Sequence, residues 1–160
     1  MPHVEGEIII NRPEEEVVQD TNFGKWWFKL ENGILKLVLR SGLKLGTTYL
    51  LSVKGRRTGG VHSTPVVLVE RDGERYLVAP YGPVNWVRNA RAAGAVTLTR
   101  CRHSEVLHIM ETGPEESAPI LKKYLAIAPA TRSCFHARRD SPVQEFVAEA
   151  PRHPVFRLVA

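Results

Sequence analysis

Short apolar stretches separated by tight turns constrain the fold of this chain more than any other feature. Six of them predict strands, at residues 47–53, 64–70, 75–80, 96–101, 105–110 and 155–159. The sequence Arg71-Asp72-Gly73-Glu74 predicts a tight hairpin turn, with glycine where a positive φ is needed. Local hairpins of this kind favour an antiparallel barrel or half-barrel over a parallel, doubly wound sheet.

A basic, glycine-rich segment joins the first two predicted strands. Residues 54–60 read Lys-Gly-Arg-Arg-Thr-Gly-Gly. Glycines let backbone N–H groups point outward together, and cationic side chains beside them make a trap for phosphate or carboxylate. The alternative is ordinary solvated surface charge. Because the loop runs from strand to strand, it matches neither a dinucleotide fingerprint nor a P-loop, which both lead into a helix.

Four segments carry helical patterns. Residues 23–43 form an amphipathic pattern with a basic face, which predicts a membrane-surface anchor, a lid over a ligand or a helix that plugs a barrel. A shorter helix is expected between Pro83 and Gly94. Capping boxes starting at Thr112 and Ser141 predict helices that run to about Ile127 and Glu149, with a loop over residues 129–140 between them.

Composition bounds the organisation of the chain. With 160 residues, 43% hydrophobic and 24% charged, we expect a single domain at residues 23–160 preceded by an extension at residues 1–22. The net charge of +5 favours an acidic partner: nucleic acid, an anionic membrane surface or a polyanionic small molecule. The sequence shows no secretory leader and no apolar run long enough to span a bilayer, so a cytoplasmic protein is expected, with possible peripheral membrane contact through residues 23–43.

Side chains that would perform chemistry by themselves are not grouped in the sequence. Cys101 and Cys134 form no CxxC pair, and the six histidines are scattered, so no metal site is expected. Ser133 or Cys134 with His136 is too local to make a persuasive nucleophile and base. An enzyme with this sequence would therefore rely on a cofactor.

Four segments in order, residues 50–59, 63–66, 71–79 and 85–94, resemble the deazaflavin-dependent nitroreductase family. The similarity extends over roughly residues 25–112. It implies a mainly β fold with flanking helices, a split β-barrel of the FMN-binding split barrel-like type. It further implies a homodimer that binds coenzyme F(420), an 8-hydroxy-5-deazaflavin, and transfers a hydride from the reduced coenzyme to a small organic acceptor.

The resemblance also assigns site residues. A first group would hold the phosphate and acidic tail of the coenzyme: Lys54, Arg56, Arg57, Thr58 and Gly59. A second group would lie beside its ring: Ser63, Thr64, Pro65, Ala79, Pro80, Tyr81, Gly82, Trp86 and Asn89. Tyr81 would position the substrate, with Ser133 or His136 as further candidates.

Two departures from the family pattern leave alternatives open. Pro80-Tyr81 replaces a small polar and basic pair, and a tyrosine-rich substrate loop is missing from residues 129–140, so nitroimidazole or quinone reduction does not follow from the resemblance. The same barrel could bind FMN, haem or a fatty acid instead. A nucleic-acid-binding protein would use six arginines, two of which are shared with the coenzyme-binding group: Arg56, Arg57, Arg100, Arg102, Arg138 and Arg139.

Overall fold

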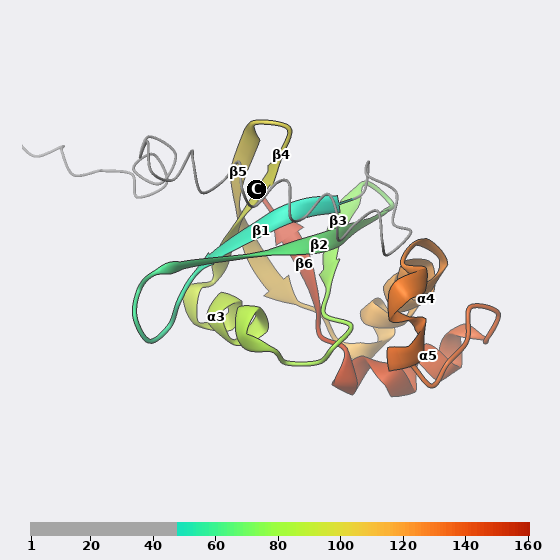
Figure 1. Ribbon diagram of the computed structural model, residues 1–160. Coiled ribbons are helices and arrows are strands. Elements are labelled where there is room, and N and C mark those ends of the chain that lie inside the picture. Colours follow the sequence, from blue (N-terminus) through green and yellow to red (C-terminus); the bar gives the residue numbers. More distant parts are fainter. Residues whose placement is uncertain (1–47) are drawn as a thin grey trace, which may run out of the picture. The chain divides into compact units, whose positions relative to one another are not determined.

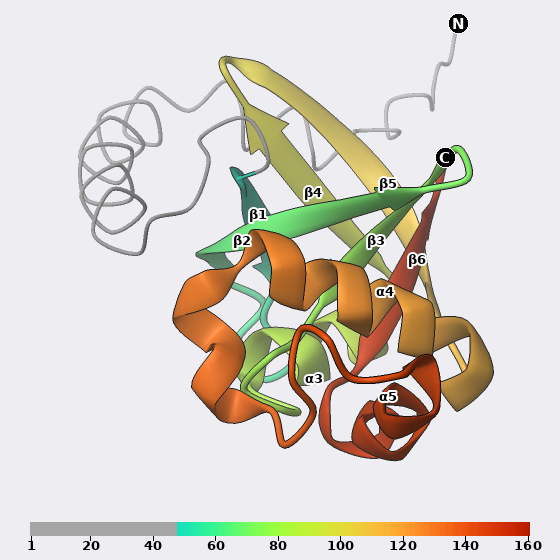
Figure 2. The same ribbon diagram turned by 90° about the vertical axis from the view of Figure 1, so that its right-hand side faces the viewer.

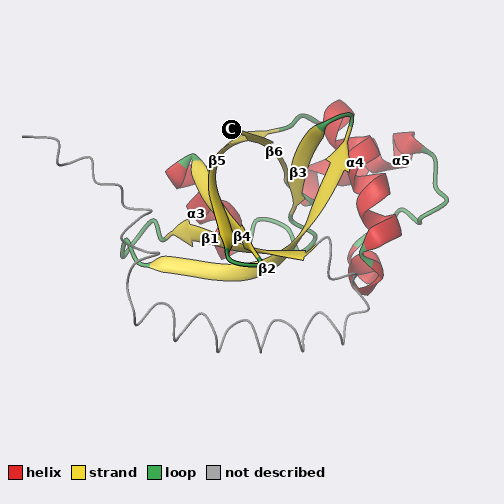
Figure 3. Ribbon diagram, turned by 90° about the horizontal axis from the view of Figure 1, so that it is seen from above, coloured by secondary structure: helices red, strands yellow, loops and turns green. Residues whose placement is uncertain are grey.

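A closed barrel of six antiparallel strands forms the body of the protein in the computed structural model, which describes residues 48–160 (Figures 1 and 3). The strand order is β1-β2-β3-β6-β5-β4. Their bounds are β1 Thr48–Lys54, β2 Val61–Arg71, β3 Glu74–Val78, β4 Ala95–Arg100, β5 His103–Glu111 and β6 Val155–Val159. The predicted mainly β, split-barrel class is confirmed.

Two hairpins are closed by two-residue turns with positive φ. Asp72 (φ 53°) and Gly73 (φ 80°) join β2 to β3, as the sequence predicted. Cys101 (φ 48°) and Arg102 (φ 68°) join β4 to β5 in the same way, although neither residue is a glycine. Positive φ at both central residues gives the backbone twist that matches a right-handed pair of strands.

The barrel is closed by pairings between strands that are distant in the sequence. The last strand, β6, lies between β3 and β5, and the middle of β1 pairs with β4. Alternate residues of each strand fill the interior with apolar side chains, among them Leu51, Leu77, Leu98, Leu107 and Phe156. Helix α3 (Asn85–Ala93) packs Val87 and Ala90 against this interior core.

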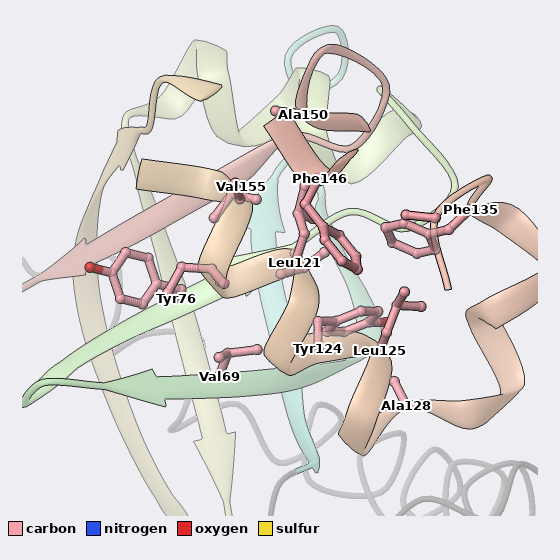
Figure 4. Packing of buried hydrophobic residues seen from close by; sticks show 14 of the residues in the cluster. Val69, Tyr76, Leu121, Tyr124, Leu125, Ala128, Phe135, Phe146, Ala150 and Val155 are labelled. Carbon is pink, nitrogen blue, oxygen red and sulfur yellow. The ribbon is translucent and has the colours of Figure 1, made fainter. Parts of the chain in front are cut away.

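A second apolar cluster lies outside the barrel. Helices α4 (Pro114–Ile127) and α5 (Val143–Glu149) lie together on one side of the strands (Figures 2 and 3). Leu121 and Leu125 of α4 pack against Phe146 of α5 and against Val69 of β2 (Figure 4). The helices and the strands bury their apolar faces against each other, so the helices cover the outer face of the barrel on the side of β2, β3 and β6.

The segments next to these helices are short 3₁₀ turns. The predicted loop after α4 contains η3 (Pro129–Cys134), and η4 (Ala150–Arg152) follows α5 directly.

Both predicted capping boxes are wrong. Gly113 and Pro142 are the N-cap residues of α4 and α5, and neither helix has a side-chain cap. The Thr112 hydroxyl lies 2.6 Å from the Ser117 hydroxyl and donates to the Val155 carbonyl at 3.1 Å, while Ser141 Oγ accepts from the Arg138 N–H. Each side chain is therefore committed to a tertiary or turn contact instead of the helix end.

The predicted basic helix at residues 23–43, with its membrane contact, and the extension at residues 1–22 lie outside the described residues. Among the helices of residues 48–160, none has the length and apolar character needed to cross a membrane.

Candidate functional site

A cavity of about 650 Å³ lies between the tip of the β1–β2 hairpin and helix α3. Figure 1 shows this tip, residues 55–60, beside α3. Its lining comes from the tip, the start of β2 and the first turns of α3: Gly55, Arg56, Arg57, Thr58, His62, Ser63, Thr64, Val84, Asn85, Trp86, Arg88 and Asn89.

The tip is a compact turn held by its own backbone. The Gly55 N–H donates to the Gly60 carbonyl at 2.7 Å, and the Gly59 N–H donates to the Gly55 carbonyl at 3.0 Å. Gly59 adopts a φ of +76°, which favours glycine. The backbone N–H groups of Arg57 and Thr58 have no protein partner within the described part of the chain, so they can donate to a ligand or to water.

Asn89 joins the tip to α3. Its side-chain oxygen accepts from the Arg56 backbone N–H at 3.2 Å and from Arg56 Nη1 at 2.8 Å. Asn89 is only 5% exposed, and its Nδ2 amide has no hydrogen-bond partner among residues 48–160. A buried donor without a partner is costly, so this amide at the cavity wall can be satisfied by an acceptor that enters the cavity.

The charge of the cavity is entirely positive. Arg56, Arg57 and Arg88 line it, and no aspartate or glutamate does. Concave surfaces of one charge sign concentrate ions of the opposite sign. The cavity is therefore suited to an anion, and its three guanidinium groups to a polyanion such as a phosphate with carboxylates.

The other wall of the cavity is less polar. The Trp86 ring is tilted by 60° against Phe156 of the interior core, with 6.0 Å between the ring centres, and Val84 packs against the same core. On the β2 side, Ser63 and Ser52 share a hydrogen bond of 2.7 Å between their hydroxyls. An aromatic and aliphatic wall beside hydroxyl groups is suited to a planar ring that carries polar edges.

Seven of the predicted cofactor-binding residues line this cavity. They are Arg56, Arg57, Thr58, Ser63, Thr64, Trp86 and Asn89. The others do not: Lys54, Gly59, Pro65, Ala79, Pro80, Tyr81 and Gly82. The role of each of these residues toward a cofactor stays a prediction.

Backbone hydrogen bonds fix the segment 79–82, one to the C-terminal part of the chain and one within the segment. The Ala79 N–H donates to the Pro154 carbonyl at 2.9 Å, and the Gly82 N–H donates to the Ala79 carbonyl at 3.2 Å. Tyr81, the predicted substrate-positioning residue, has 67% of its surface exposed. Its side chain is thus free to meet a ligand at the outer end of the β3–α3 connection.

A buried charged network holds this connection in place. His153, 4% exposed, lies with Nδ1 2.8 Å from the Pro80 carbonyl and Nε2 3.1 Å from Glu149 Oε2, and its ring stacks on Phe135. Burial lowers the pKa of His153 below its ordinary value, although the bonds to Pro80 and Glu149 act in the opposite direction.

Glu149 is the centre of that network. Burial on its own would raise the pKa of Glu149, but the N–H groups of Ala137 and His136 and the charges of Arg152 and His153 outweigh it, so the pKa is lowered. The carboxylate therefore stays ionised, although it is only 2% exposed.

The two other predicted substrate candidates lie apart from the cavity. Ser133 belongs to η3, and the exposed His136 ring lies 3.1 Å from Arg152 Nη1. Nearby, burial raises the pKa of Tyr124 to about 12, so this tyrosine is a neutral hydrogen-bonding group at physiological pH.

Five lining residues were not among the predicted cofactor-binding residues: Gly55, which belongs to the predicted anion-binding tip, and His62, Val84, Asn85 and Arg88. His62 was missed because β2 begins at Val61, three residues before the predicted start. Arg88 precedes Asn89 on α3 and could have been recognised by its position on the same short helix.

Residues 36–132, more than half of the chain, match the sequence model of the F(420)H(2)-dependent quinone reductase family. No curated protein matches the chain.

Several solved structures are similar at low identity. An F(420)-H2 dependent reductase, FDR-A, is 21% identical over 70% of this chain and 93% of its own, with a TM-score of 0.48. A structure described as a domain-swapped dimer is 18% identical over 84% of this chain and 98% of its own, with a TM-score of 0.48. A NimC/NimA family protein from Clostridium acetobutylicum is 10% identical over 74% of this chain and 78% of its own, with a TM-score of 0.47. With TM-scores below 0.5, these likenesses support no conclusion about activity.

Proposed function

Because the chain belongs to the F(420)H(2)-dependent quinone reductase family, we propose that it binds coenzyme F(420) in the cavity between the β1–β2 tip and α3. We further propose that it transfers a hydride from the reduced coenzyme to a small organic acceptor. One observation supports the proposal most directly. The cavity is lined by three arginines and no carboxylate, and the Asn89 Nδ2 amide at its wall has no hydrogen-bond partner among residues 48–160.

The charged end of the coenzyme fits this wall. A deazaflavin coenzyme carries a phosphate and a tail of several glutamates, so it needs cationic and N–H donors at one end. Arg56, Arg57 and Arg88 supply guanidinium groups, and Asn89 Nδ2 supplies a buried donor. Charge-assisted hydrogen bonds of this kind contribute on the order of 1.5–3 kcal/mol each.

The ring end fits the opposite wall. Trp86 and Val84 offer apolar surface, and the Ser63 and Thr64 hydroxyls lie along β2. Tyr81 would meet the acceptor at the exposed end of the β3–α3 connection. The bound coenzyme would supply the hydride, while these residues bind, orient and partly shield the reacting ring.

The class of acceptor is a further part of the proposal. The family description names quinones, so a soluble naphthoquinone is the first acceptor to test. The homodimer expected from the resemblance stays a prediction, to be measured by light scattering. The FMN alternative receives no support from the comparisons.

Binding to the purified protein tests the proposal directly. We expect oxidised and reduced coenzyme F(420) to bind at micromolar concentrations, and FMN to bind more weakly. The double variant Arg56→Ala/Arg57→Ala should weaken binding by about 10-fold to 100-fold, since it removes two charge-assisted contacts. Arg71→Ala/Arg139→Ala is the matched control, because it also removes two positive charges and both arginines are exposed and outside the cavity lining.

Two outcomes would contradict the proposal. One is the absence of coenzyme binding at micromolar concentrations. The other is an equal loss of affinity in Arg71→Ala/Arg139→Ala, which would mean that net charge determines the affinity and the cavity does not. Oxidation of the reduced coenzyme by the naphthoquinone, followed by absorbance, would then test turnover separately from binding.

A further inference from the structure

The side chain of His62 occupies space that only a glycine at position 55 leaves open. His62 is the second residue of β2 and pairs with Val53 of β1. A Cβ atom on Gly55 would lie 2.8 Å from His62 Nε2 and 2.9 Å from Cδ2, closer than real contacts of this kind. Because Gly55 carries no side chain, the imidazole can lie against the backbone of the tip, at the wall of the cavity.

The surroundings of this imidazole are cationic. Arg56 and Arg57 of the tip and Arg88 of α3 line the same cavity as the ring. No carboxylate lines the cavity, and within residues 48–160 the His62 ring has no hydrogen bond or ion pair. An imidazole in this place has no negative partner until an anion enters the cavity.

An anion in the cavity changes the balance between the two forms of the ring. Nearby negative charge stabilises imidazolium relative to neutral imidazole, and histidine is the side chain that changes charge near physiological pH. Binding and protonation are therefore linked, and the linkage is reciprocal: the anion favours the proton, and the proton favours the anion.

We propose that His62 is a proton-linked ligand of the cavity, which takes up a proton from solvent when a polyanionic cofactor binds and then donates a charge-assisted hydrogen bond to it. This inference rests on the proposed function, since it adds a fourth cation to the same anion site. The balanced step is neutral His62, one proton and the free anion giving imidazolium paired with the bound anion. Affinity consequently rises as the pH falls.

Titration of coenzyme F(420) between about pH 5 and about pH 8 tests this step. His62→Gln keeps a polar side chain without the charge, and His62→Arg keeps a charge that does not titrate. Wild type should gain about fivefold in affinity toward the acidic end relative to both variants. Any titration of the coenzyme itself is shared by all three proteins and cancels in the comparison.

Calorimetry in two buffers with different ionisation enthalpies provides a second, independent readout. Wild type should take up a fraction of a proton per coenzyme bound, and the two variants should take up less. Thermal melting shows whether each variant is folded, and because His62 is exposed, both substitutions can be accommodated.

The outcomes separate the two proposals. Equal pH dependence and equal proton uptake in all three proteins would overturn the role of His62 and leave the proposed function intact. Absence of coenzyme binding by wild type across the whole pH range would overturn the proposed function, and this inference with it.

Discussion

At the scale of single residues, the cavity shows what a sequence can and cannot reveal about a site. Arg56, Arg57 and Thr58 could be predicted because a basic, glycine-rich tip between two strands favours an anion site and the family resemblance assigned these residues to it. Tyr81 was assigned by resemblance, and it lies outside the lining of the cavity. The pair of hydrogen bonds from Arg56 to Asn89 could not be predicted, because it joins residues 33 positions apart, through the backbone N–H and the guanidinium of Arg56 and the side-chain oxygen of Asn89.

Asn89→Asp separates the structural role of this residue from its role toward a ligand. The carboxylate can still accept both bonds from Arg56, so we expect the melting temperature to change by only a few degrees. The substitution removes the Nδ2 donor and adds a negative charge to an anion site. Affinity for coenzyme F(420) should therefore fall at least about tenfold, measured by fluorescence titration.

The control for this prediction is Gln144→Glu, which changes net charge equally on the exposed surface of α5. Unchanged affinity in Asn89→Asp, with the protein folded, would exclude the Asn89 amide as a ligand contact.

At the scale of elements, the positions of the strands and helices were easier to predict than the residues at which the helices begin. The strand patterns located all six strands because side-chain alternation repeats over several residues. The two capping boxes failed because a single threonine or serine can serve a tertiary contact as well as a helix end, and the Thr112 hydroxyl bonds to Val155. A local sequence pattern does not show that a distant residue competes with the helix end for the same hydroxyl group.

Glu149 fixes α5 and the segment after η3, and we predict that Glu149→Gln destabilises the protein by about 3 kcal/mol at neutral pH. The carboxylate accepts from the His136 and Ala137 N–H groups at 2.6 and 2.7 Å and from Arg152 Nη2 at 2.9 Å. The amide of glutamine cannot satisfy all of these donors. Urea unfolding measures the effect, and Glu145→Gln on the exposed face of α5 should be nearly neutral.

The same residue predicts a pH dependence. Since the pKa of Glu149 is lowered in the folded protein, its stabilisation is present above the unfolded value of about 4.3 and is lost as the pH falls through the folded value. The stability of wild type should therefore fall more steeply below about pH 4.3 than that of Glu149→Gln. Parallel curves for the two proteins would mean that this carboxylate is not the group that titrates.

At the scale of the whole molecule, the described residues contain two apolar cores separated by one layer of strands. Leu77 lies in the interior core and Leu121 in the outer core, and both are fully buried. The sequence predicted a barrel or a half-barrel and could not decide between them. Closure depends on the pairing of β6 with both β3 and β5, which brings the end of the chain to its middle.

We predict that the two cores unfold as one cooperative unit. Strands β2, β3 and β6 contribute side chains to both, so neither core can lose its packing without the other. Leu77→Ala and Leu121→Ala should each cost about 3 kcal/mol and leave a single unfolding transition. Separate transitions followed by tryptophan fluorescence and by circular dichroism would contradict this prediction.

The contact between Arg56 and Asn89 also determines when conformational entropy is lost. A free arginine side chain loses rotamer freedom worth up to about 2 kcal/mol when it is fixed. Arg56 loses that freedom as the protein folds. The side chains of Arg57 and Arg88 have no hydrogen bond or ion pair within residues 48–160, so they keep theirs until a ligand arrives. The cavity thus combines one rigid guanidinium, suited to a group of fixed shape such as phosphate, with two adaptable ones, suited to an acidic tail of variable length.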